Sequence, residues 1–335
     1  MSYDIQDVLK ICEGVDIIAR KWLHLRRREK CVIVTTTTHL EEGQIMKQRF
    51  QRVNNHVDFM VMEETGKKIG EFFDKNETVF DNYDVIVGAT DYSIVTTVAV
   101  KRAIGRGSKF LSLPLSTNNG KAMLGFDFIR MDTKKSKLMA KVIKKYIDDA
   151  QSVRVTTKLG TNLVFMKRGR PAGFFNGDVR DGYGFSSASI ELYVPIEETK
   201  TNGILMLDGS LGYAGAVKKP FRVEIKDGRI TSIEDSEDGK RLKEYIESFG
   251  DERMYITAEL GIGLNSLSNC VGNCYIEDES AYGTFHIGFG RNIALGGIQE
   301  ASGHYDLVTY NADIFADNRI IIKDGRVTVP EPQVY

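Results

Sequence analysis

Hydrophobic residues in the first part of the chain follow two spacings, one typical of strands and one typical of amphipathic helices. Short apolar runs predict strands at residues 31–36, 57–62, 83–90 and 109–115. Helical spacing predicts helices at residues 8–25, 40–53, 93–104 and 133–150. Strands that alternate with helices indicate an open, mostly parallel sheet. We therefore expect an α/β domain over residues 1–150.

After residue 150 the pattern changes to short strands joined by turns, with one short helix expected at residues 239–249. Turn signals that favour strand pairs stand at Leu159-Gly160-Thr161, Asn202-Gly203, Asp227-Gly228 and Asp324-Gly325. The predicted fold class is thus α/β plus β-rich. An N-terminal open α/β sheet domain would be followed by a largely antiparallel β domain over residues 151–335.

Composition narrows the function classes. The 335 residues carry 45 Lys and Arg against 46 Asp and Glu, so the basic excess of a nucleic-acid binder is missing. The apolar runs fall short of the roughly 20 residues that a membrane span needs. The first residues include acids where a signal peptide needs a basic and then an apolar segment, so we expect a cytoplasmic protein.

Two common cofactor motifs are missing or weak. No predicted strand is followed by GxGxxG or GxxxxGK[ST], and Gly105-x-Gly107 comes after a helix, so a dinucleotide site is not predicted. Cys270 and Cys274 have three residues between them, which makes a redox or zinc-ribbon reading weak.

Ligand-type side chains gather at residues 259–306. This stretch holds two of the chain's five histidines and several carboxylates: His286, His304, Glu259, Glu277, Glu279 and Asp306. Imidazole and carboxylate form the usual mixed ligand set for zinc, cobalt, manganese or non-haem iron. The competing interpretation is a set of solvated loop residues on a glycine-rich surface.

Strand geometry favours the metal interpretation. In GTFHIGFG, His286 shares a strand face with small residues, which leaves room for an ion. His304 and Asp306 form an HxD pair, whose side chains project to the same side of an extended chain. Glu191 and Glu259 stand in apolar surroundings, where a buried carboxylate requires a partner such as a cation. A solvated strand face is the alternative for Glu191.

Taken together, the motifs of the second half resemble the dinuclear metallo-aminopeptidases of the aminopeptidase T and aminopeptidase S family. The matching set comprises Glu191 ahead of a proline, an NG turn, DGS at 208–210, KDGRI at 226–230, AELGIGLN at 258–265, the block from DE to HIGFG, and HYD at 304–306. The resemblance covers residues 150–330, whereas the N-terminal half matches mainly in layout.

The resemblance implies two divalent ions (zinc, cobalt, manganese or magnesium) in the β-rich domain. The implied ligands are Glu191, Glu259, Glu279, His286, His304 and Asp306, with Glu259 bridging the ions and acting in catalysis. Glu277 competes with Glu279 for its place. Such ions activate a bridging water and polarise a carbonyl. The expectation is a homodimeric aminopeptidase, a hydrolase that releases N-terminal residues from short peptides.

One departure from the family keeps other functions open. The peptidases carry a tyrosine, thought to assist the oxyanion, where this chain has Asn292, whose amide can still donate a hydrogen bond. The first alternative is a single-iron, ring-cleaving dioxygenase of the 2,5-dihydroxypyridine type, with His286, His304 and Asp306 as a facial triad. Retention of Glu259, where those oxygenases are understood to have a histidine, favours the peptidase. The second alternative is a metal-binding homologue without peptidase activity.

Overall fold

The computed structural model describes residues 3–182 and 184–329, and the chain divides into two compact units. Unit 1 comprises Met1–Thr133 and Phe175–Ser189, and unit 2 comprises Lys134–Phe174 and Ile190–Tyr335. This division differs from the predicted boundary at residue 150 in two places. Helix α5 (Thr133–Asp149) falls almost entirely in unit 2, and the segment Phe175–Ser189 returns to unit 1.

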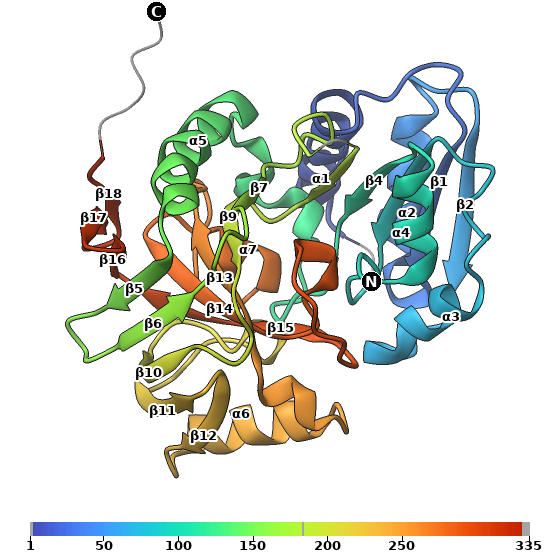
Figure 1. Ribbon diagram of the computed structural model, residues 1–335. Coiled ribbons are helices and arrows are strands. Elements are labelled where there is room, and N and C mark those ends of the chain that lie inside the picture. Colours follow the sequence, from blue (N-terminus) through green and yellow to red (C-terminus); the bar gives the residue numbers. More distant parts are fainter. Residues whose placement is uncertain (1–2, 183, 330–335) are drawn as a thin grey trace, which may run out of the picture. The chain divides into compact units, whose positions relative to one another are not determined.

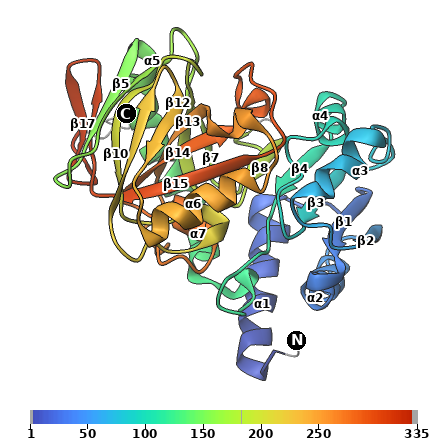
Figure 2. The ribbon, with the colours of Figure 1, turned by 90° about the horizontal axis from the view of Figure 1, so that it is seen from below.

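Unit 1 contains a five-stranded sheet in the order β2-β1-β3-β4-β8, and every pair in it is parallel. Its strands are β1 (Cys31–Thr36), β2 (Val57–Met62), β3 (Val85–Ala89), β4 (Lys109–Ser112) and β8 (Phe185–Ser187). Its helices are α1 (Ile5–Ile17), α2 (Leu40–Phe50), α3 (Gly70–Lys75) and α4 (Val98–Gly105). Figure 2 shows α1 and α2 on one face of this sheet and α3 and α4 on the other. The predicted α/β domain type is therefore confirmed.

Local sequence explains the ends of these elements. All residues of β1 and β3 are buried, as expected for central parallel strands covered on both faces. Helix α1 begins after Asp4, whose carboxylate accepts a hydrogen bond from the Asp7 amide as an N-cap. The predicted helix at residues 8–25 begins earlier and ends in a π-helical turn, Ile18–Trp22.

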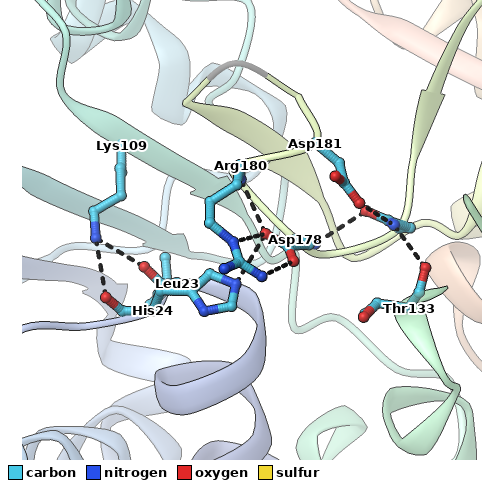
Figure 3. Close-up of polar contacts among 8 residues, drawn as sticks. Leu23, His24, Lys109, Thr133, Asp178, Arg180 and Asp181 are labelled. Atoms are coloured by element: carbon cyan, nitrogen blue, oxygen red, sulfur yellow. Dashed lines mark hydrogen bonds and ion pairs between the residues drawn. The ribbon is translucent and has the colours of Figure 1, made fainter.

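The segment that returns to unit 1 is tied there by buried polar contacts (Figure 3). Asp178 lies 2.9 Å from His24 Nε2, and it accepts hydrogen bonds from the backbone and guanidinium of Arg180. Asn176 donates to the Thr133 carbonyl and to Asp181. The contacts of Asp178 with His24 and of Asn176 with Thr133 join residues 154 and 43 positions apart, which explains why local patterning did not reveal the return.

We predict that Asp178→Asn lowers the stability of unit 1 by about 2 kcal/mol, a typical value for hydrogen bonds to a charged group. Burial opposes ionisation of Asp178, but Arg180 and His24 together hold the pKa of this carboxyl below its usual value. A depressed pKa stabilises the fold above the unfolded pKa, near 4 for Asp, and the contribution disappears as pH falls through the folded pKa. Thermal unfolding of wild type and variant should therefore differ at pH 7 and converge in acid.

The control for this prediction is Asp127→Asn, the same chemical change at a side chain that is 78% exposed. It should change stability by less than about 0.5 kcal/mol. Equal melting temperatures for Asp178→Asn and wild type at pH 7 would show that the return segment is held by other contacts.

Unit 2 contains two sheets (Figure 1). All pairs of the first sheet are antiparallel, as are the pairs that join β15, β14, β13 and β9 in the second. The first has the order β12-β11-β10-β6-β5-β16-β17-β18, and the second β15-β14-β13-β9-β7. The strands of the first are β5 (Ser152–Thr156), β6 (Asn162–Met166), β10 (Asn202–Leu207), β11 (Phe221–Lys226), β12 (Arg229–Ile233), β16 (Asp313–Ala316), β17 (Arg319–Lys323) and β18 (Arg326–Val327). Those of the second are β7 (Gly173–Phe175), β9 (Glu191–Pro195), β13 (Thr257–Gly263), β14 (Thr284–Gly290) and β15 (His304–Tyr310). Besides α5, unit 2 has helices α6 (Glu237–Glu247) and α7 (Tyr275–Ser280). The predicted β-rich domain type is confirmed.

Most of the predicted turns form. Asp227-Gly228 and Asp324-Gly325 have positive φ at both positions, as a two-residue hairpin turn requires, and they join β11 to β12 and β17 to β18. The prediction of a turn at Asn202-Gly203 is wrong, because these residues begin β10 and pair with β6. A Cβ at position 203 would lie 2.0 Å from the Asn162 carbonyl oxygen, so this glycine serves a close strand approach.

Within residues 3–182 and 184–329, none of the helices has the length and apolar character needed to cross a membrane.

Candidate metal centre

One face of the sheet β15-β14-β13-β9 carries the ligand-type residues predicted from these strands. Because side chains alternate between the faces of a strand, residues in cross-strand register share a face. Glu259 is opposite Gly288, which is opposite Asp306, and Gly261 is opposite His286. The strand register also places Glu191 and Tyr193 of β9 and His304 of β15 on this face.

Glycines between the ligand-type residues provide the space. A Cβ at Gly261 would lie 1.8 Å from His286 Nε2. A Cβ at Gly288 would lie 2.7 Å from His304 Cε1 and 2.9 Å from Asp306 Oδ1. All three separations are too short for non-bonded atoms, so a Cβ at either position would push the imidazoles and the Asp306 carboxylate away from where they lie. The apolar residues that alternate with these glycines are buried.

A β-bulge sets the direction of Glu259. The pairing of β13 with β14 shifts register between Thr257 and Glu259. A bulge re-aims the side chain that follows it, and such bulges are frequent beside active sites. The carbonyl of the extra residue, Ala258, accepts hydrogen bonds from Ile196 and Asn292.

The candidate ligands form three overlapping groups whose ligand atoms lie within 4.8 Å of one another: Glu259, His304 and Asp306; Glu191, Glu259 and His286; and Glu279, His286 and Asp306. His304 Nε2 lies 3.2 Å from Glu259 Oε2 and 3.3 Å from Asp306 Oδ1, so the predicted HxD convergence is observed. His286 Nε2 lies 2.6 Å from Glu191 Oε2. Among the described residues, none of these groups contains both histidines. The facial triad of the dioxygenase alternative, His286, His304 and Asp306, therefore does not come together in one group.

The two competing glutamates, Glu277 and Glu279, have different surroundings on helix α7. Glu279 is 97% buried and belongs to the group with His286 and Asp306. Glu277 instead accepts a hydrogen bond from the Asn269 amide through Oε1. The structure therefore brings Glu279 to the cluster and directs Glu277 to a neighbouring loop.

The cluster concentrates negative charge away from water. Burial, together with Glu191 and Asp306, raises the pKa of Glu259 to about 7. Burial lowers the pKa of His286, but Glu191 and the other carboxylates outweigh it and raise the value to about 9. Burial opposes ionisation of Asp306, whose pKa His304 nevertheless lowers to about 2. These opposed shifts describe a buried site with more carboxylates than the two imidazoles can balance.

Unsatisfied atoms test whether a cation fits. Within the described part of the chain, Glu191 Oε2, Asp306 Oδ1 and His286 Nδ1 are buried and make no hydrogen bond of normal geometry. Buried polar atoms are normally satisfied, and exceptions call for an explanation such as an ion. Two imidazoles and four carboxylates surround the space that the glycines leave, and this ligand set suits a divalent metal ion. The residues present therefore fit a bound metal.

One ligand is already oriented from outside the cluster. His304 Nδ1 lies 2.8 Å from the Arg291 carbonyl oxygen, which can only accept. In the neutral ring that binds metals, the proton would sit on Nδ1 and leave the Nε2 lone pair to face an ion, as in many metal sites. The His304 side chain is 19% exposed, whereas that of His286 is 1% exposed, so the group around His304 is the one that solvent reaches.

The catalytic role predicted for Asn292 does not fit its contacts. Its amide nitrogen donates to Glu198 Oε1 at 2.9 Å and to the Ala258 carbonyl at 3.1 Å. Its amide oxygen accepts from the Gln299 backbone. Both N–H groups are thus used inside the protein, so Asn292 has none to offer an oxyanion. These contacts tie the loop between β14 and β15 to Glu198 and to the backbone of β13.

An α/β unit, a β-rich unit and a buried imidazole–carboxylate cluster define a candidate metalloenzyme. A family model described as "NicX: 2,5-dihydroxypyridine 5,6-dioxygenase" matches residues 128–329, which is more than half of the chain. The chain belongs to this family. A curated relative from Pseudomonas putida, "2,5-dihydroxypyridine 5,6-dioxygenase", is 25% identical over 218 residues. The match spans 60% of this chain and 60% of the relative's length.

Two solved structures share the fold. A 2,5-dihydroxypyridine dioxygenase from Pseudomonas putida KT2440 superposes with a TM-score of 0.80 at 17% identity, covering 97% of this chain and 98% of its own. Wild-type AmpT from Thermus thermophilus superposes with a TM-score of 0.67 at 12% identity, covering 96% of this chain and 99% of its own. The resemblance to aminopeptidase T thus holds for the fold.

The predicted activity is wrong. The family model and the curated relative both carry the name of a ring-cleaving dioxygenase, an oxidoreductase, so the aminopeptidase and hydrolase assignments are corrected. The peptidase prediction gave weight to Glu191 and Glu259, but carboxylates suit several metals and do not specify hydrolysis. The candidate metal-binding groups remain, whereas the number and identity of the ions stay predictions.

Proposed function

We propose that the protein is a metal-dependent dioxygenase that opens the ring of a dihydroxylated pyridine or a closely related electron-rich aromatic compound. The observation that carries this proposal is the buried group of Glu259, His304 and Asp306 in a chain of the dioxygenase family. The curated relative's name supplies the substrate class.

Glu259, His304 and Asp306 would hold the ion on which the reaction depends, because this group is the one that solvent reaches. Iron(II) bound there would supply the redox chemistry by which dioxygen reacts with an aromatic ring. The protein's own contribution is to fix the His304 tautomer through the Arg291 carbonyl and to keep water from the buried carboxylates. His286, Glu191 and Glu279 would support Asp306 and Glu259 or hold a second ion.

In the proposed reaction, dioxygen is both the oxidant and the source of the two added oxygen atoms. The bond between ring carbons 5 and 6 breaks, and each of these carbons gains one oxygen atom of the same O₂ molecule. The ring carbons are oxidised and O₂ is reduced, so no external reductant is needed.

The experiment that tests this function is oxygen uptake. Metal-free protein is loaded anaerobically with Fe²⁺, Mn²⁺ or Zn²⁺ and mixed with 2,5-dihydroxypyridine in aerated buffer. We expect uptake with iron, in proportion to loss of the ring's absorbance, and none with zinc, which has no redox chemistry. Protein that retains iron yet consumes neither oxygen nor any hydroxylated pyridine or dihydroxybenzene would contradict the proposal.

A further inference from the structure

The hydroxyl of Tyr275 contacts the candidate ligand Asp306 from outside the cluster. Tyr275 Oη donates a hydrogen bond to Asp306 Oδ2 at 2.6 Å. The other carboxylate oxygen, Oδ1, lies 3.3 Å from His304 Nε2 and makes no hydrogen bond of normal geometry to any described residue. The two oxygens of one carboxylate therefore have different partners, and the unsatisfied one faces the cluster.

The tyrosine ring is itself held in place. It stacks on Tyr213, with ring centroids 4.4 Å apart and planes 22° from parallel. Gly212, which has a φ of 62°, allows this approach, because a Cβ there would lie 2.9 Å from the Asp306 carbonyl oxygen and 3.5 Å from the Tyr275 ring. The segment that carries Tyr213 thus packs against both Tyr275 and the backbone of Asp306.

Helix α7 links this contact to a second candidate ligand. Tyr275 and Glu279 are four residues apart, so they lie on the same face of the helix. Glu279 belongs to the group with His286 and Asp306. One short helix therefore delivers both a carboxylate to the cluster and a hydroxyl to the neighbouring carboxylate.

We propose that Tyr275 is a positioning residue that holds Asp306 in one orientation, so that Oδ1 alone faces the ion. A carboxylate can bind a metal through one oxygen or through both, and a fixed donor on one oxygen restricts this choice. A neutral hydroxyl suits the task, because it satisfies Oδ2 without adding a cation that would compete with the metal. The inference rests on the assignment of Asp306 as a ligand in the proposed function.

The test is Tyr275→Phe, which keeps the ring that stacks on Tyr213 and removes only the hydroxyl. The probe is Co²⁺, whose affinity is measured by chelator competition and whose coordination is read from its visible absorption spectrum. We expect the dissociation constant to rise about 10- to 100-fold, as for other outer-shell partners of metal ligands, and the cobalt bands to change. A wild-type affinity and spectrum would overturn the proposal.

The matched control is Tyr305→Phe. Tyr305 lies beside Asp306 in β15, is fully buried, and donates its hydroxyl to the Met254 carbonyl at 3.0 Å. Loss of this hydroxyl should lower the melting temperature but leave cobalt affinity and spectrum unchanged. Equal affinity losses in both variants would indicate a general effect on β15 and would reject a specific role for Tyr275.

A second variant keeps the test decisive if Tyr275→Phe does not fold. Tyr213→Ala leaves the Tyr275 hydroxyl in place but removes its stacking partner, so cobalt affinity should fall by a smaller factor. Unchanged affinity in Tyr213→Ala would then overturn the proposal. Cobalt binding needs no turnover, so failure of this inference is distinct from failure of the proposed reaction, which would appear as absent oxygen uptake in wild type.

Discussion

Replacing His304 with alanine is expected to abolish tight metal binding and ring-dependent oxygen uptake. His304 is the imidazole of the group that solvent reaches, and its Nε2 lies within 3.3 Å of both Glu259 and Asp306. Its removal leaves carboxylates in that group with no neutral nitrogen ligand. We expect activity to fall by more than the roughly 10- to 100-fold that loss of an outer-shell partner costs. Iron content after desalting and initial rates of oxygen uptake measure the two effects.

His56→Ala is the control for this variant, because His56 is an exposed histidine in unit 1. It should retain the iron content and oxygen uptake of wild type. Retention of iron and full turnover by His304→Ala would mean that the ion binds elsewhere, for instance in the group around His286.

Gly288→Ala should disable the cluster without removing any ligand. The added Cβ would meet His304, Asp306 and the Glu259 side chain at distances below 3.0 Å, so these residues must shift. Overpacking of this kind costs about 1–3 kcal/mol of stability. We therefore expect a lower melting temperature together with a large loss of metal affinity, measured by chelator competition.

Gly105→Ala is the matched control, since no atom lies within 4 Å of the Cβ that it would add at the end of α4. It should leave metal affinity unchanged and alter stability by at most about 1 kcal/mol, in the stabilising direction. Wild-type metal affinity in Gly288→Ala would show that the close packing around this glycine is not required by the site.

Local patterning was sufficient for most of the elements. Strands β1 and β2 have the bounds that their hydrophobic runs predicted. The central strand β1 is buried throughout, as a continuous apolar run implies, whereas the edge strand β2 is only partly buried. The hairpins at Asp227-Gly228 and Asp324-Gly325 form because their backbone angles suit these residues. The return of Phe175–Ser189 to unit 1 depends on long-range contacts such as Asp178 with His24, which periodicity does not report.

Much of the candidate site was also predictable, because strand alternation places ligands on one face. The metal-site prediction could have been strengthened by the repeated glycine spacing in ELGIG and HIGFG. These glycines leave one strand face without side chains between the ligands. The choice of Glu279 over Glu277 depended on the orientation of α7, and the anchoring role of Asn292 depended on Glu198, ninety-four residues away. Neither contact is visible in a local motif.

The motifs did not decide the reaction: they ranked the peptidase first and kept the dioxygenase, which the family model and the curated relative support, as the first alternative. A fold shared with AmpT and a set of hard oxygen ligands are compatible with hydrolysis and with oxygen chemistry alike. The site residues define where an ion would bind, whereas the substrate and the ion's redox activity decide what happens there.

The proposed ring cleavage is tested most directly by the fate of labelled dioxygen. Iron-loaded protein is supplied with ¹⁸O₂ and 2,5-dihydroxypyridine in ordinary water, and the ring-opened product is analysed promptly by mass spectrometry. Both labelled atoms of one O₂ molecule should appear in the product, and His304→Ala should yield no such product. A product whose added oxygen comes from water, or protein that binds iron and leaves the ring intact, would contradict the proposal.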